Sequence, residues 1–309
     1  MGKLAICVPT RDHAEVVEQI VCYSIEYLYR NGTDIYYYDS GKGDDTRRIV
    51  TALNEKGYDN IYRVAVPGEL SFGQKVDMIL SGYGLKEDYD YIWPIKDRTI
   101  CNEEMLRLVL ARASAEPAAD VMISLTLGDI FEGDHIDIDS PLELYRLFAK
   151  QTTSLETAIY NTKTILKDYE YGLCAKAEKH QDDFWHYMFL YNALAGMDHP
   201  VISIISKDGA CNMVSSEAKG SGWRDRVFEV WVDEWVKLNY ELPDLYSPCK
   251  LQAIKDTTSI EEILGTREVF ERLYADGILT AETFEKYESL WQFVTPVPVE
   301  EIRKIAMDE

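Results

Sequence analysis

The chain has 309 residues, of which 54 are acidic and 32 basic, so its formal net charge is -22 at pH 7. Such a charge repels phosphate backbones and anionic lipid surfaces, which argues against nucleic acid as a partner of the molecule as a whole. No apolar stretch approaches the roughly 20 residues of a membrane span, and the first residues lack the apolar stretch of a signal peptide. Six scattered cysteines without a C-x-x-C pair favour reduced thiols and a cytoplasmic location, with a disulfide or zinc framework as the alternative.

The first hundred residues predict alternating strands and helices, because short apolar runs alternate with segments of helical spacing. The expected strands and helices are, in chain order, 4–10, 11–32, 34–40, 44–56, 60–66, 73–82 and 89–95. Alternation with short connections that contain Gly and Asp predicts an α/β fold with a mostly parallel sheet covered by helices. Ligands bind such a sheet beyond the carboxyl ends of its strands.

Polar or charged residues follow each of the four expected strands. They are Pro9, Thr10, Arg11 and Asp12 after the first, Asp39 to Thr46 after the second, Ser71, Gly73 and Lys75 after the third, and Lys96, Asp97 and Arg98 after the fourth. Because parallel strands end at one edge of the sheet, we expect these groups to meet there. Each also has a structural alternative: Thr10 or Asp12 as a helix cap, and the glycines that follow Asp39 as an ordinary turn.

The order of these motifs, strand–PTRD, then strand–DS…DDT, then YIW…D, resembles the nucleotide-sugar half of the GT-A fold glycosyltransferases, in particular bacterial family 2. The resemblance covers roughly the first hundred residues well and the rest loosely. It implies that Pro9, Thr10 and Asp12 line a nucleotide pocket. By the same resemblance, Asp39 accepts a hydrogen bond from the uracil ring or the ribose, and Lys75 contacts the nucleotide from the third helix.

The chain departs from the family at the end of the fourth strand, where Lys96-Asp97-Arg98 replaces the usual Asp-x-Asp motif. In the family these carboxylates bridge to the donor diphosphate through Mg²⁺ or Mn²⁺, ions that prefer oxygen ligands and retain several waters. One interpretation keeps Asp97 as a metal ligand, and a second has Lys96 or Arg98 neutralise the diphosphate directly. A third makes the triplet a solvated strand exit, with Arg98 paired to Glu103 or Glu104. An extended segment would point Lys96 and Arg98 one way and Asp97 the other.

The acceptor chemistry is expected near a buried helix that runs from Phe184 to Ala195 and follows Asp182 and Asp183. By resemblance this acidic pair supplies the general base that takes the proton of the acceptor hydroxyl in an inverting transfer, with Asp183 preferred. The alternative for the acids is an N-terminal cap that serves the helix dipole. His186 is expected either to orient the carboxylate, to act as the base itself, or to be a packed histidine.

A Gly/Ser-rich stretch that carries Lys219, Arg224 and Arg226 follows, either as a loop that closes over the diphosphate or as a hinge before an amphipathic helix. The last fifty residues have a charged helical pattern, which packs back on the core or forms a homodimer surface. The expected organisation is a GT-A domain at 1–215, with a nucleotide-sugar half at 1–105 and an acceptor half at 106–215, and a helical C-terminal region at 216–309.

The resemblance implies an inverting transfer of one sugar from a nucleotide sugar, expected to be UDP-linked, to a glycan, glycoprotein or lipid-linked acceptor, with Mn²⁺ or Mg²⁺ as the expected cofactor. The chain lacks the Gln-x-x-Arg-Trp pattern of processive synthases, which favours transfer of a single sugar. Two other functions remain open. One is a nucleotidyltransferase, although the Gly-rich, arginine-bearing signature of that class is absent after the first strand. The other is a non-catalytic relative that binds a nucleotide sugar or a partner enzyme.

Overall fold

The computed structural model describes residues 2–125, 131, 133, 135–207, 211–213, 224–260 and 263–308. Two compact units make up the chain. Unit 1 contains Met1–Pro141, Gln151–Ala177 and Phe184–Glu217, and unit 2 contains Leu142–Lys150, Glu178–Asp183 and Ala218–Glu309. The domain boundary expected between residues 215 and 216 lies outside the described residues.

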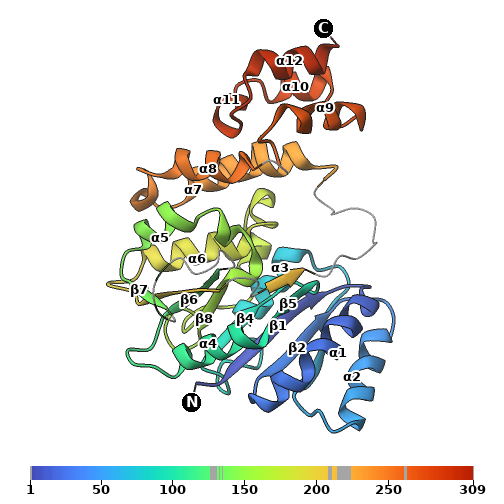
Figure 1. Ribbon diagram of the computed structural model, residues 1–309, viewed down its shortest axis with the longest axis vertical. Coiled ribbons are helices and arrows are strands. Elements are labelled where there is room, and N and C mark those ends of the chain that lie inside the picture. Colours follow the sequence, from blue (N-terminus) through green and yellow to red (C-terminus); the bar gives the residue numbers. More distant parts are fainter. Residues whose placement is uncertain are drawn as a thin grey trace. The chain divides into compact units, whose positions relative to one another are not determined.

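The sheet of unit 1 has eight strands among the described residues, in the order β3-β2-β1-β4-β8-β6-β9-β7 (Figure 1). They are β1 Leu4–Thr10, β2 Asp34–Asp39, β3 Ile61–Ala65, β4 Tyr91–Pro94, β6 Val121–Leu125, β7 Ile136–Ile138, β8 Ala158–Asn161 and β9 Ile202–Ser206. β1 pairs in parallel with β2 and β4, and β2 with β3, whereas β8 runs antiparallel to β4 and β6. The four N-terminal strands predicted from the sequence thus form the parallel half of a mixed sheet.

Helices flank this sheet, and their ends follow from local sequence signals (Figure 1). The helices of unit 1 are α1 Ala14–Arg30, α2 Asp45–Glu55, α3 Phe72–Leu80, α4 Glu103–Ala113 and α6 Trp185–Ala195. α3 begins with a capping box in which Ser71 and Gln74 each satisfy the other's backbone N–H. Asn102 caps the N-terminus of α4, where its side chain accepts a hydrogen bond from the Met105 N–H.

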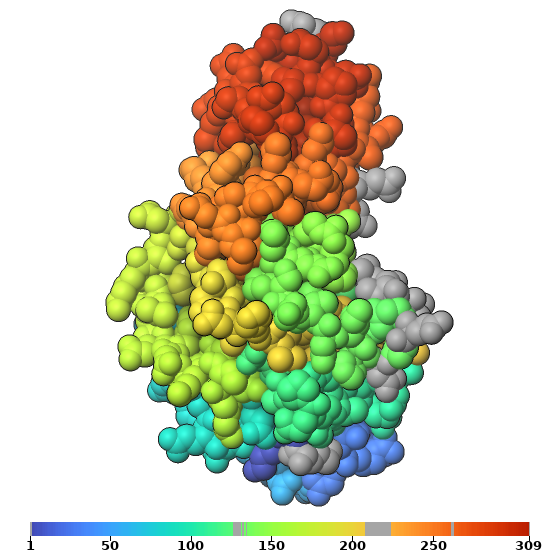
Figure 2. Space-filling view, turned by 90° about the vertical axis from the view of Figure 1, so that its left-hand side faces the viewer, coloured from blue at the N-terminus to red at the C-terminus, as the bar shows by residue number. Residues whose placement is uncertain are grey.

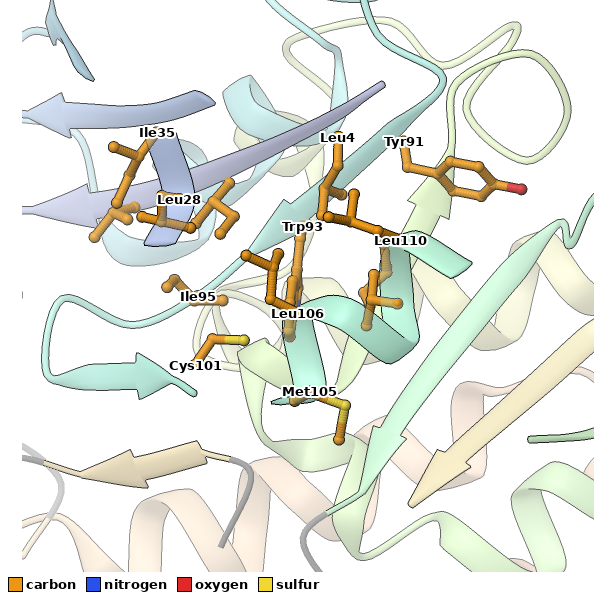
Figure 3. Close-up of a cluster of buried hydrophobic side chains, with 14 of the residues drawn as sticks. Leu4, Leu28, Ile35, Tyr91, Trp93, Ile95, Cys101, Met105, Leu106 and Leu110 are labelled. Carbon is orange, nitrogen blue, oxygen red and sulfur yellow. The ribbon is translucent and has the colours of Figure 1, made fainter. Parts of the chain in front are cut away.

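A hydrophobic core cluster joins β1, β2 and β4 to α1 and α4 (Figure 3). Leu4 and Trp93 from the strands and Leu106 from α4 are at most 1% exposed. Full burial of such a side chain stabilises a fold by about 1.5–3 kcal/mol. Trp93 also donates its indole N–H to the carbonyl of Glu156 at 2.7 Å, which satisfies its one polar atom. The cluster fixes β1 beside β4, so the residues that follow these two strands lie close together.

The chain turns immediately after β4 instead of staying extended. The Thr99 N–H donates to the Lys96 carbonyl at 3.0 Å, with Asp97 and Arg98 in the turn. The next residues form β5 (Thr99–Cys101), which pairs antiparallel with β10 (Cys211–Met213). The triplet is therefore not extended, and the condition under which Asp97 would point away from its two cationic neighbours is not met.

Unit 2 is helical. Its α-helices and π-helix are α5 Pro141–Phe148, the π-helix η5 Glu229–Glu234, α7 Trp235–Glu241, α8 Lys250–Thr258, α9 Arg267–Ala275, α10 Ala281–Lys286, α11 Trp291–Val294 and α12 Val299–Met307. Within the last four helices (red in Figure 2), Trp291 of α11 is fully buried against the rings of Phe270 of α9 and Phe284 of α10. Among the described helices, none has both the length and the apolar character needed to cross a membrane.

Candidate functional site

The carboxyl ends of β1, β2 and β4 meet at one edge of the sheet. Thr10 ends β1 and lies in register beside Asp39, which ends β2. The Thr10 hydroxyl donates a hydrogen bond of 3.0 Å to Oδ2 of Asp97, which follows β4. Three polar residues that are far apart along the chain are thus brought together where α/β sheets bind ligands.

Asp97 is held by two partners through a single carboxylate oxygen. Nδ1 of His13 lies 2.7 Å from the same Oδ2 that accepts the Thr10 hydrogen bond, and the Asp97 side chain is 13% exposed. Oδ1 of Asp97 makes no hydrogen bond within the described part of the chain, so it remains available to a ligand. His13 was not among the expected site residues. Its position directly after the PTRD motif was the available signal.

Asp39 is buried and anchored from two sides. Oδ2 accepts a hydrogen bond of 2.8 Å from Nε of Arg63, and Oδ1 accepts one of 2.8 Å from the Gly41 N–H. A Cβ at Gly41 would lie 2.9 Å from Oδ1 of Asp39 and 3.1 Å from Oδ1 of Asp12, so only glycine fits between the two carboxylates. Asp12 has a φ of 54°, the left-handed region, and its Oδ1 accepts the Lys42 N–H at 3.0 Å. The loops after β1 and β2 are therefore bound to each other.

A small open cavity of about 120 Å³ lies between these two loops, lined in part by Asp12, Asp39 and Gly41. Pockets for a whole drug-sized ligand usually measure about 300–1,000 Å³. The cavity therefore suits one part of a larger ligand, such as a single ring or a group of hydroxyls. Its lining is rich in carboxylate oxygens, which accept hydrogen bonds from N–H and O–H donors.

Lys75 of α3 contacts the carboxyl ends of β1 and β2. Its ammonium donates to the Thr10 carbonyl at 3.4 Å and to Oγ of Ser40 at 3.2 Å. Burial lowers the pKa of Lys75, while the nearby carboxylates, Asp97 foremost, oppose that change. Lys75 thus fixes the backbone at the ends of β1 and β2, and Pro9 is buried within β1 at the same edge. Direct contact of Lys75 or Pro9 with a nucleotide stays a prediction.

The two cations of the triplet differ in what they contact. Nζ of Lys96 lies 3.4 Å from Oε2 of Glu156 and 3.3 Å from Oγ of Ser154, so its charge is already paired. Arg98 is half-buried, and its guanidinium makes no ion pair or hydrogen bond with the described residues. Of the two, Arg98 is the one whose charge is available to an anionic ligand.

The acids expected to pair with Arg98 face other cations. Glu103 bonds Arg30 at 3.1 Å, and Glu104 bonds Lys207 at 3.2 Å. The pairing of Arg98 with Glu103 or Glu104 that was expected for a solvated strand exit is therefore wrong, while the solvated strand exit itself stays a prediction. The reason is that α4 directs both acids toward other partners.

In unit 2, Asp183 belongs to an acidic cluster around Arg226. Nη1 of Arg226 lies 3.2 Å from Oδ2 of Asp183, Nη2 lies 3.3 Å from Oε1 of Glu234, and Nε lies 3.1 Å from Oε2 of Glu229. Burial raises the pKa of Asp183, and the neighbouring Asp182 adds to this, while Arg226 opposes both. Asp183 is thus held by an ion pair with Arg226 within a cluster of acids. The sequence pattern did not indicate that Arg226 is its partner.

Two further expected residues have structural partners. His186 on α6 is 3% exposed, and its Nε2 lies 2.9 Å from the Thr153 carbonyl. Burial lowers the pKa of His186 to about 4, so the ring is neutral at neutral pH and matches the packed-histidine alternative. Arg224 bonds Oδ2 of Asp276 at 2.5 Å within unit 2. Lys219, expected in a loop that closes over the diphosphate, lies outside the described residues.

Comparison with known proteins gives no match to a protein-family profile or to a curated protein. Solved structures do match. TarS 1–349 of S. aureus in complex with UDP has a TM-score of 0.57 at 13% identity, over 99% of this chain and 90% of that one. Its complex with UDP-GlcNAc has a TM-score of 0.54 at 14% identity, over 99% and 91%. The mannosyltransferase PcManGT from Pyrobaculum calidifontis, in complex with GDP-Man and Mn²⁺, has a TM-score of 0.53 at 13% identity, over 100% and 88%.

The chain has the GT-A glycosyltransferase fold. This confirms the fold predicted from the order of the N-terminal motifs. In this GT-A chain, the group formed by Thr10, Asp39 and Asp97 occupies the carboxyl edge of the parallel strands, and Asp183 belongs to the separate helical unit.

Proposed function

We propose that the chain is a glycosyltransferase that moves one sugar from a UDP-linked donor to an acceptor hydroxyl with inversion at the anomeric carbon. The observation that carries the proposal is the hydrogen-bonded convergence of Thr10 and Asp97 beside Asp39, at the ligand-binding edge of a GT-A sheet. The likeness to proteins solved with UDP, UDP-GlcNAc or GDP-Man supports the same class of donor.

The nucleoside is assigned to the cavity between the β1 and β2 loops. Asp12 and Asp39 place carboxylate oxygens there, which match the ring N–H of uracil and the hydroxyls of ribose. Gly41 lets the Asp12 and Asp39 carboxylates lie close together, because any side chain at this position would collide with them. Lys75 holds the two strand ends that carry these groups in place.

The diphosphate is assigned to Asp97 and Arg98. The described residues contain no group of three or more side chains that could hold a metal by themselves. Mg²⁺ and Mn²⁺ at phosphate sites are commonly bound by one or two carboxylates, with phosphate and water as the other ligands. Oδ1 of Asp97 could supply the single protein carboxylate ligand of such an ion. A bound ion there would stabilise the negative charge that develops on the departing diphosphate, and Arg98 would add a guanidinium matched to phosphate oxygens.

The base is assigned to Asp183. In the transfer, the acceptor oxygen forms a bond to the anomeric carbon while its proton passes to the Asp183 carboxylate. The bond from the anomeric carbon to the phosphate oxygen breaks, and its electron pair leaves with the nucleoside diphosphate. The Asp183 side chain is 33% exposed, so an acceptor can reach it. Its raised pKa brings it closer to the pH at which a general base is most effective.

Several parts of this assignment remain predictions from the sequence. They are the acceptor class (glycan, glycoprotein or lipid-linked), the homodimer through the C-terminal helices and the cytoplasmic location. The second candidate, a non-catalytic nucleotide-sugar binder, is favoured by one observation: a single carboxylate follows β4 where the family usually has two.

Slow hydrolysis of donor sugars separates the two candidates. We expect the protein to release UDP from at least one of a panel of UDP-sugars when water takes the place of the acceptor, because the site activates the departing diphosphate. Release is followed with a coupled assay for UDP, with Mn²⁺ and with EDTA. A protein that binds UDP but releases none from any donor, alone or with acceptor sugars, is the non-catalytic binder.

A further inference from the structure

One guanidinium in unit 2 is fixed by three acids. Each of the nitrogens Nη1, Nη2 and Nε of Arg226 bonds a different carboxylate, those of Asp183, Glu234 and Glu229. Because the guanidinium is planar and presents its donors in a rigid fork, it cannot turn toward one acid without losing another. The orientation of the Asp183 carboxylate is thereby tied to that of Glu229 and Glu234.

Glu234, the acid that contacts Nη2 of Arg226, is buried. The Glu234 side chain is 5% exposed, whereas those of Asp183 and Arg226 are 33% and 38% exposed. Glu229 and Glu234 begin and end the π-helix η5, so they lie five positions apart, the spacing of a π-helical hydrogen bond. That spacing lets both acids reach the same guanidinium. Single π-helical turns often occur at functional sites, where they redirect side chains.

The charges around Asp183 are unequal. Arg226 is the cation that contacts it, and Lys179 bonds Glu229 at 3.1 Å from the other side. The acids that face it are Glu229 and Glu234 of η5 and the adjacent Asp182. The acids outnumber the two cations, so their mutual repulsion favours a proton on one of them. Burial disfavours the ionised form most for the least exposed acid.

That acid is Glu234. Burial, with Asp183 as the next cause, raises the pKa of Glu234 to about 7. Both acids contact Arg226, but the Asp183 side chain is the more exposed of the two. Environments that separate the pKa values of neighbouring acids are how active sites divide the acid and base roles.

We propose that Arg226 is a positioning residue for sugar transfer: its guanidinium, anchored by Glu234, holds the Asp183 carboxylate in one orientation for the acceptor proton. This inference rests on the proposed function, in which Asp183 is the base.

The test compares Arg226→Met with Lys237→Met. Both remove one positive charge from unit 2, but Lys237 pairs with Asp233 on the preceding turn and contacts none of the acids around Arg226. For Arg226→Met we expect kcat to fall roughly 100-fold with the donor KM nearly unchanged, since misplacement of a reacting group by about 1 Å costs that much. Loss of the cation also raises the pKa of Asp183, so the acidic limb of the pH–rate profile moves up by about one unit. Arg226→Lys should restore the position of the acidic limb, because it keeps the positive charge. It should restore only part of kcat, because lysine lacks the planar set of donors that contacts three acids at once.

A second variant, Glu234→Gln, mimics the protonated acid. We expect it to leave the acidic limb in place, because Glu234, with a pKa of about 7, is already protonated at acidic pH. Titration of ¹³C-labelled aspartate carboxyls by NMR reads the pKa of Asp183 without any turnover. If Arg226→Met lowers activity with an unmoved Asp183 titration, or if Lys237→Met has the same effects, the inference is overturned. If the wild type transfers no sugar but the Asp183 pKa still rises in Arg226→Met, the proposed function fails while the electrostatic coupling stands.

Discussion

Replacement of Asp183 by asparagine is expected to lower the rate of sugar transfer by roughly 100- to 10,000-fold, the usual contribution of a general base. Asparagine keeps the size of the side chain and can still bond Arg226, but it cannot accept the proton of the acceptor hydroxyl. Binding of UDP should be unchanged, because the base acts on the acceptor. The measurement pairs transfer kinetics with a UDP titration of the same variant.

Two controls accompany this variant. Asp182→Asn removes the adjacent carboxylate and should retain most of the activity. His186→Gln tests the buried histidine, whose Nε2 contact to the Thr153 carbonyl a glutamine amide can replace. Near-normal turnover by Asp183→Asn would contradict the assignment and transfer the role of base to His186 or to another carboxylate.

Replacement of Asp97 by alanine is expected to weaken donor binding in the presence of Mn²⁺ by roughly 10- to 100-fold, the worth of a hydrogen bond or ligand contact to a charged group. The variant removes the free Oδ1 and releases both Thr10 and His13. Thr10→Ala removes one hydrogen bond and should cost only about fivefold. Calorimetric titration of UDP into both variants, with Mn²⁺ and with EDTA, gives the comparison.

The condition without metal separates the two roles considered for the triplet. If Asp97 works through a bound ion, Asp97→Ala should not weaken UDP binding in EDTA, because it then removes only a negative charge near the diphosphate. If Arg98 carries the diphosphate instead, Arg98→Ala weakens binding equally with and without Mn²⁺. Equal and negligible effects of Asp97→Ala and Thr10→Ala would contradict any donor role for this edge.

The parallel half of the sheet was predictable because its signals are local. Each strand from β1 to β4 is a short apolar run that ends in polar residues, and each helix between them has an apolar face. The turn at Asp97 was not predictable in this way. It depends on the pairing of β5 with β10, a partner more than a hundred positions away that is only three residues long. Local patterns carry no information on such a pairing.

The same limit explains which contacts of the site were missed. Thr10, Asp39 and Asp97 were predictable as a group because strand ends meet at one edge. The partner of Asp39, Arg63, comes from the neighbouring strand β3, and the partner of Asp183, Arg226, lies 43 positions further along the chain. Long cationic side chains are found at many surface positions, so their sequence gives no sign of which carboxylate they reach.

The most direct measurement of the central claim is a titration of UDP followed by thermal unfolding, with Mn²⁺ and with EDTA. If Thr10, Asp39 and Asp97 form a nucleotide-sugar site, a UDP concentration of 100 times Kd should stabilise the fold by about 2.7 kcal/mol and raise the unfolding midpoint by roughly 5 °C. The shift should shrink in Asp39→Ala and Asp97→Ala. An unfolding midpoint that stays constant with UDP, GDP and other nucleoside diphosphates, whether or not Mn²⁺ is present, would contradict the account.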